Sequence, residues 1–143
     1  MFIGEFAHSI DEKGRVAVPF RFRRDLGKGA IIAKSIEQSL TIYPKQEWQN
    51  MAEKLANLPM FDPKAKALSR FIFSSAVEVE FDSQGRALIP HNLRDYAQLN
   101  KSTIVIGVYN KIEIWDNQKW VEEQKKSGIG TLKFEQDIQR LGI

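Results

Sequence analysis

Short runs of alternating or continuous apolar residues recur along the chain, and both patterns predict β-strands. Alternating runs present one apolar face, whereas short branched runs are typical of buried strands. The predicted strands are residues 9–10, 15–18, 30–33, 40–43, 77–81, 86–89, 103–108 and 111–115. The chain is therefore expected to be dominated by short strands.

Helical periodicity fills the intervals between these strands. Between residues 45 and 58 apolar side chains recur every three or four positions, and Pro59 ends the pattern. Asp62 and Pro63 predict the cap and first turn of a second helix, which extends to about residue 74. Shorter helices are predicted at residues 20–26, 91–99 and 117–126, and residues 132–141 are expected to be helical or frayed.

The chain also contains an internal repeat. Residues 11–19 and 82–90 share the pattern D-x-x-G-R-φ-x-φ-P, in which φ is apolar, and the two copies lie 71 positions apart. After one inserted residue the repeat continues at a separation of 72, where residues 40–43 correspond to 112–115. Chance is a poor explanation for the same order of Asp, Gly, Arg, Pro, Arg and Trp in both copies. The sequence therefore predicts two related units.

Each predicted unit has too few short strands to bury a large core alone, so the two are expected to share one. The expected organisation is a first repeat at 1–50, a helical connector at 51–76, a second repeat at 77–121 and a helical tail at 122–143. The fold class predicted from these patterns is α+β, dominated by β-structure, with peripheral helices.

Composition narrows the class of protein. The 143 residues are 43% hydrophobic and 27% charged, which is typical of a globular chain, and no apolar run approaches the length of a membrane span. Cysteine is absent, which excludes disulfides, thiolate zinc sites and cysteine nucleophiles. The first residues lack the features of a secretory signal. These observations favour a cytoplasmic protein without a membrane partner.

Positive charge is concentrated in one stretch of the first repeat. The net charge is only +3, but six basic residues between positions 13 and 28 face a single acidic one, Asp25. They are Lys13, Arg15, Arg21, Arg23, Arg24 and Lys28. Such a cluster attracts phosphate chains, although a solvated face without a partner produces the same pattern.

The two predicted hairpin turns are the candidate nucleic-acid contacts. Arginine binds phosphate or the edge of guanine, and a glycine lets the backbone approach closely. The candidate DNA-binding residues of the turns are Lys13, Gly14, Arg15, Gln84, Gly85 and Arg86. Asp11 and Asp82 are predicted to orient the turns, and an alternative is that each aspartate simply pairs with the arginine four residues later.

Four further arginines are secondary candidates for contacts with phosphates rather than bases. They are Arg21, Arg23, Arg24 and Arg94. A solvated or structural role is an open alternative for each of them.

Enzyme chemistry is not indicated. His8 and His91 do not occupy equivalent positions in the repeats, and neither belongs to a metal-binding spacing. His8 is interpreted as a packing or hydrogen-bonding residue, whereas His91 is expected to face solvent or DNA. Ser74 and Ser75 lack a nucleophile-elbow motif. We therefore expect no catalytic residues, no cofactor, no metal and no small-molecule substrate.

Several motifs together resemble the MraZ family. They are the doubled D-x-x-G-R followed by proline and Phe-Arg or Leu-Arg, the opening Gly4-Glu5-Phe6-x-His8-x-Ile10-Asp11, the segment Phe73-Ser74-Ser75-Ala76, and Ile112-Glu113-Ile114-Trp115-Asp116. The resemblance extends from Phe2 to about Trp120. It implies a bacterial transcription regulator built from two swapped-hairpin domains of the AbrB and SpoVT type.

The resemblance also implies partners and site residues. MraZ-like proteins are expected to form a ring-shaped homo-oligomer, often an octamer, and to bind short direct repeats of double-stranded DNA upstream of the division and cell wall gene cluster. A nucleoid-associated location follows. The family's D-x-x-x-R motifs map onto Asp11 with Arg15 and onto Asp82 with Arg86, and Lys13 of the first copy corresponds to the neutral Gln84.

Two other functions remain open. One is a ring-forming interaction module with incidental nucleic-acid affinity, and the other is a single-strand binder, which would need exposed aromatic side chains among its basic residues. The repeat-related aromatic residues are instead interpreted as core or subunit contacts; they are Phe22, Tyr43, Trp48, Trp115 and Trp120.

Overall fold

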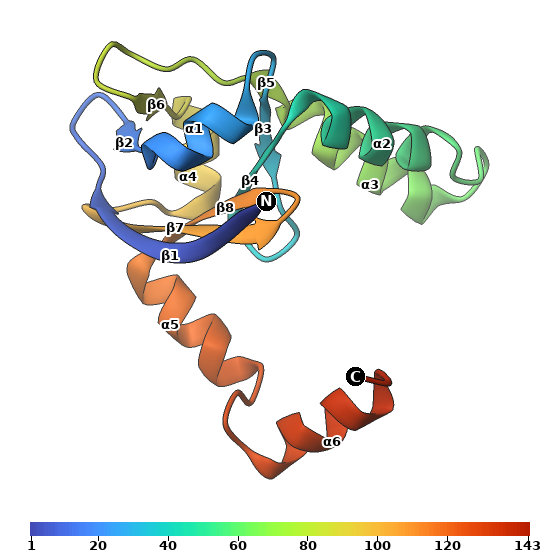
Figure 1. The fold of residues 1–143 in the computed structure, drawn as a ribbon. Coiled ribbons are helices and arrows are strands. Elements are labelled where there is room, and N and C mark those ends of the chain that lie inside the picture. The colour runs from blue at the N-terminus through green and yellow to red at the C-terminus, as the bar shows by residue number, and fades with distance from the viewer.

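The computed structural model describes residues 1–143 and contains eight strands and six helices (Figure 1). The strands are β1 (Phe2–Ser9), β2 (Arg15–Ala17), β3 (Ile31–Lys34), β4 (Leu40–Tyr43), β5 (Val77–Glu78), β6 (Arg86–Leu88), β7 (Ser102–Tyr109) and β8 (Ile112–Asp116). The helices are α1 (Phe20–Leu26), α2 (Lys45–Ala56), α3 (Pro63–Ser75), α4 (His91–Ala97), α5 (Asn117–Lys126) and α6 (Leu132–Arg140).

Six strands form one antiparallel sheet whose order reflects the sequence repeat. The order is β1-β7-β8-β4-β3-β5. In the repeat, β1 corresponds to β5, β3 to β7 and β4 to β8. If each strand is replaced by its equivalent, the order becomes β5-β3-β4-β8-β7-β1, which is the same sheet read from its other edge. The central pair of strands has the same symmetry. At its midpoint Thr41 of β4 lies opposite Glu113 of β8, and these two residues are equivalent in the repeat. The sheet therefore has a pseudo-twofold axis between β4 and β8.

The remaining two strands, β2 and β6, pair only with each other. Their antiparallel register places Val16 opposite Ala87, with Arg15 opposite Leu88 and Ala17 opposite Arg86. Each strand touches its own predicted hairpin partner through a single bridge, Ile10 with Val16 in one repeat and Phe81 with Ala87 in the other. The hairpins of the two repeats are thus paired across the axis, which is the swapped-hairpin arrangement.

A single core joins the two repeats. Its largest cluster contains sixteen buried residues, drawn from both units, and Phe22 of α1 and Leu93 of α4 are fully buried in it. Phe22 packs edge-on against Phe2 and Phe6, with ring centroids 5.5 and 5.3 Å apart. Burial of each large apolar side chain stabilises the fold by about 1.5–3 kcal/mol. The predicted β-dominated α+β fold with a shared core is confirmed.

The longer helices lie outside this body. Helices α2 and α3 project to one side, and α6 stands apart at the end of α5 (Figure 1). Asp62 caps α3 through its carboxylate, as predicted, and Asp116 caps α5 in the same way. Residues 132–140 are helical, although no side chain of α6 is buried. None of the helices combines the length and apolar character needed to cross a bilayer.

The first strand differs most from its prediction. The sequence indicated a strand only at residues 9–10, whereas β1 begins at Phe2 and pairs along its whole length with β7. Gly4, Glu5 and His8 interrupt the apolar alternation, so the side-chain pattern did not indicate a strand before residue 9. Conversely, the strand predicted at 77–81 is reduced to Val77–Glu78 and one bridge at Phe81.

Candidate nucleic-acid interface

The first D-x-x-G-R segment folds into a tight turn held by its aspartate. Asp11 Oδ1 accepts hydrogen bonds from the backbone amides of Lys13 at 3.0 Å and Arg15 at 2.9 Å. The amide of Gly14 donates to the carbonyl of Asp11 at 3.0 Å. Gly14 adopts a φ of +84°, a conformation that other residues rarely adopt. The spacing of Asp, Gly and Arg therefore encodes this turn locally.

The second turn repeats the geometry of the first. Asp82 Oδ1 accepts from the amides of Gln84 and Arg86, both at 2.9 Å, and the Gly85 amide donates to the Asp82 carbonyl at 3.0 Å. Gly85 has a φ of +77°. The two aspartates thus accept equivalent backbone hydrogen bonds in the two turns.

The arginines of the two turns form one ion-pair cluster with the two aspartates. Arg15 Nε donates to Asp11 Oδ2 at 2.7 Å, and Arg86 Nε donates to Asp82 Oδ2 at 2.8 Å. Longer contacts cross between the repeats, from Arg86 to Asp11 at 3.6 Å and from Arg15 to Asp82 at 3.8 Å. The pairing of β2 with β6 creates this cluster by bringing the turns side by side.

The cluster is partly open to solvent. The side chains of Arg15 and Arg86 are each 28% exposed. Their Nε groups are used by the aspartates, but a guanidinium has five N–H donors, so further donors remain for a ligand. Pairing within the hairpin and contact with an outside ligand are therefore compatible.

Hydrogen bonding lowers the pKa values of both aspartates. The amide of Arg15 is the main cause that holds the pKa of Asp11 below its usual 3.8, and the amide of Arg86 does the same for the pKa of Asp82. Burial opposes the shift, and the guanidinium groups add to it. Both carboxylates are therefore charged at neutral pH, and the four-residue cluster carries no net charge.

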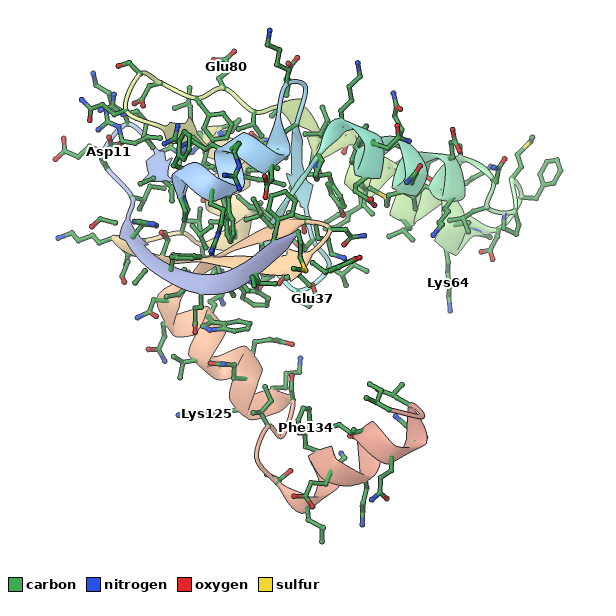
Figure 2. The ribbon with its side chains drawn as sticks, viewed as in Figure 1. Asp11, Glu37, Lys64, Glu80, Lys125 and Phe134 are labelled. Carbon is green, nitrogen blue, oxygen red and sulfur yellow. The ribbon has the colours of Figure 1, made fainter.

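The polar residues next to the cluster differ between the two turns. Lys13 and Gln84 are both exposed at equivalent positions. Lys13 places a positive charge where the second turn has a neutral amide, and Glu12 places a negative charge where the second turn has Ser83. Figure 2 labels Asp11 at the end of the molecule opposite α2 and α3, where the turns lie.

The other candidate arginines are distributed unevenly around the turns. Arg23 and Arg94 donate through Nε to the carbonyls of Val18 and Ile89, at 3.1 and 2.9 Å. Both are half-buried and lie against the turns. These two arginines therefore have structural contacts, which was the alternative interpretation of their positions in the sequence.

Arg21 and Arg24 face other parts of the surface. Arg21 donates to the carbonyl of Ile3 at 3.2 Å, and its guanidinium lies over the rings of Phe6 and Phe22. Arg24 is exposed and pairs with Asp25 at 3.1 Å. The sequence grouped these residues with the turns, but neither contacts the ion-pair cluster.

A polar groove lies beside the first turn. Its walls include Asp11 and Glu12 of the turn, His91 and Arg94 of α4, and Lys101. His91 is exposed at the start of α4, in agreement with its predicted position facing solvent or DNA. The sequence did not predict this groove, because its walls come from segments about 80 residues apart.

Ser75 and His8, which were considered for enzyme chemistry on the basis of the sequence, lie within the fold rather than in a catalytic arrangement. Ser75 Oγ accepts from the amide of Lys34 and donates to the carbonyl of Ile72. His8 is half-buried in β1, and its Nε2 has no hydrogen-bond partner. No group of three or more histidine, aspartate or glutamate side chains is arranged to hold a metal ion.

The fold and site define a class of protein with two repeats whose hairpins pair across a pseudo-twofold axis and present twin D-x-x-G-R turns. A family model described as "MraZ protein, putative antitoxin-like" matches residues 1–71 and again residues 72–140. The chain belongs to the MraZ family.

Relatives in this family are similar over most or all of their length. A transcriptional regulator MraZ of Clostridium tetani is 45% identical over 143 residues, which is 100% of both chains. The MraZ of Desulfitobacterium hafniense strain Y51 is 43% identical over the same length and coverage. That of Desulforamulus reducens is 49% identical over 120 residues, or 84% of each chain. These relatives are all named as transcriptional regulators.

Proposed function

We propose that this chain is a transcriptional regulator that binds double-stranded DNA sequence-specifically through its two D-x-x-G-R turns. As a ring-shaped homo-oligomer, often an octamer in the family, it would bind tandem short repeats upstream of the division and cell wall gene cluster. Such a protein acts in the cytoplasm at the nucleoid. The observation that carries the proposal is that the pairing of β2 with β6 brings the two turns side by side, where their arginines and aspartates form one cluster.

The geometry of the turns suits a duplex. A two-stranded ribbon fits the major groove, where an arginine fork binds the O6 and N7 atoms of guanine. Asp11 and Asp82 fix Arg15 and Arg86 through Nε, so less side-chain freedom is lost when the outer N–H groups bind. Lys13 adds a charge beside the first turn for a phosphate.

Oligomerisation would make the affinity depend on the number of repeats. Each subunit offers one pair of turns, and linked contacts gain strength through effective concentration without any new contact. Each phosphate that a turn neutralises lowers the logarithm of affinity by about 0.9 per decade of salt. Box number and spacing would therefore control specific binding.

Titration of duplexes tests the proposal. Labelled fragments from the region upstream of the division and cell wall genes, carrying no, one or several repeat boxes, are titrated with wild type, Arg15→Ala and Arg86→Ala over a salt series. Arg70→Ala is the matched control, because Arg70 is exposed on α3, away from the turns. We expect the turn variants to lose about 1–3 kcal/mol of binding free energy each while the assembly persists.

Other results would favour the other two functions. If Arg15→Ala dissolves the oligomer, the arginines build subunit contacts and the protein is an interaction module. Preference for unpaired strands would favour a single-strand binder. Affinity that is independent of box number would contradict the proposal.

A further inference from the structure

Arg23 and Arg94 each lie against the turn of the other repeat. They occupy equivalent positions, in α1 and α4, 71 residues apart. A Cβ atom placed on Gly14 would lie 2.6 Å from Arg94 Nε, and one placed on Gly85 would overlap the guanidinium of Arg23. The first repeat's helix therefore supports the second repeat's turn, and the reverse holds for α4.

Each guanidinium is hydrogen-bonded to the backbone of its own repeat and also contacts the turn of the other repeat. Arg23 Nε donates to the carbonyl of Val18, five residues earlier, and Arg94 Nε donates to the carbonyl of Ile89. These carbonyls directly precede Pro19 and Pro90, at the ends of the β2 and β6 segments. Each guanidinium is thus anchored through Nε and lies close to the glycine of the opposite turn.

Backbone hydrogen bonds cross at the same places. The Ile89 amide donates to the carbonyl of Gly14 at 2.8 Å, and the Val18 amide donates to the carbonyl of Gly85 at 3.2 Å. Each glycine is buried, between a crossing amide and a crossing guanidinium. Glycine is required twice over, for its positive φ and for the space its missing side chain leaves.

We propose that Arg23 and Arg94 are crossed positioning residues: Arg94 sets the geometry of the turn at residues 11–15, and Arg23 that of the turn at residues 82–86. Their effect on DNA affinity, though not their effect on the turns, rests on the proposed function. Removal of one arginine loosens the turn that lies far from it in sequence and leaves the turn of its own repeat intact.

Hydrogen–deuterium exchange on the full-length protein without DNA tests this directly. Peptides that span residues 11–15 and 82–86 are compared in wild type, Arg94→Ala, Arg94→Lys, Arg23→Ala and Arg23→Lys, with Arg70→Ala as the control. In both Arg94 variants we expect about tenfold faster exchange at 11–15 and no change at 82–86, because lysine lacks the planar fork. Both Arg23 variants are expected to show the reverse.

Three results would overturn the positioning role. They are unchanged exchange at both turns, equal acceleration at both turns, and acceleration in the variant's own repeat. If lysine restores DNA affinity while exchange at 11–15 is unchanged in Arg94→Ala, Arg94 acts as a simple phosphate contact. Crossed exchange effects in a protein that shows no box-dependent DNA binding would support the positioning role and reject the proposed function, so the two failures are distinguishable.

Discussion

Val16 of β2 lies directly opposite Ala87 of β6, and both side chains are completely buried. The two residues are equivalent in the sequence repeat, so this pair marks the pseudo-twofold axis of the hairpins. The pair also differs in size, because a branched residue faces a methyl group. The pairing of β2 with β6 at this point places the two turns side by side.

A larger residue at the axis should therefore destabilise the protein. We expect Ala87→Leu to lower the free energy of unfolding by about 1–3 kcal/mol, because Ala87 and Val16 are completely buried and added methyl groups overpack a core. Chemical denaturation measures the change. Leu88→Ala is the control: Leu88 is adjacent but 42% exposed, and we expect a loss below about 1 kcal/mol. A loss below about 1 kcal/mol for Ala87→Leu would show that the axis accommodates a larger side chain.

Glycine at the turns should be required for two separable reasons. Gly14→Ala introduces both a strained φ and an overlap with Arg94, so we expect it to destabilise the protein by more than about 1 kcal/mol. Gly27→Ala is the matched control, because Gly27 has a φ of +64° but no atom lies within 4 Å of the added Cβ. Thermal denaturation of both variants isolates the overlap. A loss at Gly27 as large as that at Gly14 would leave only backbone strain as the cause.

The local part of this site was predictable from the sequence, and the crossed part was not. Asp11 and Arg15 are four residues apart with glycine between them, so the turn and the ion pair follow from spacing alone. Arg94 meets Gly14 across 80 positions, and the pairing of β1 with β7 spans about 100. Apolar periodicity identifies strands but does not say which strands pair.

The two aspartates should make stability depend on pH in the acidic range. Their pKa values in the folded protein lie below the ordinary value of 3.8, because the turn amides and the arginines stabilise the charged form. The resulting stability is present above the unfolded pKa and is lost as the pH falls through the folded pKa. Wild type should therefore be more stable than Asp11→Asn at pH 7, and this difference should shrink below about pH 4.

Denaturant unfolding of wild type, Asp11→Asn and Asp82→Asn between pH 2 and pH 7 measures this dependence. Asp25→Asn serves as a comparison, because Asp25 forms only an exposed pair with Arg24 and a distant one with the N-terminus. A difference between wild type and Asp11→Asn that stays constant over this range would show that the carboxylate charge does not stabilise the turn.

The difference in charge between Lys13 and Gln84 should affect the salt dependence of DNA binding. Both side chains are exposed at equivalent positions, and Lys13 is positively charged whereas Gln84 is neutral. Lys13→Gln should reduce the slope of log affinity against log salt by about 0.9 per subunit engaged, and Gln84→Lys should increase it by a similar amount. The exchanged double variant, Lys13→Gln with Gln84→Lys, should restore the wild-type slope if the two turns are interchangeable on the duplex. A slope that remains low in the double variant would show that only the first turn lies close to phosphate, since a charge moved to the second turn then neutralises nothing.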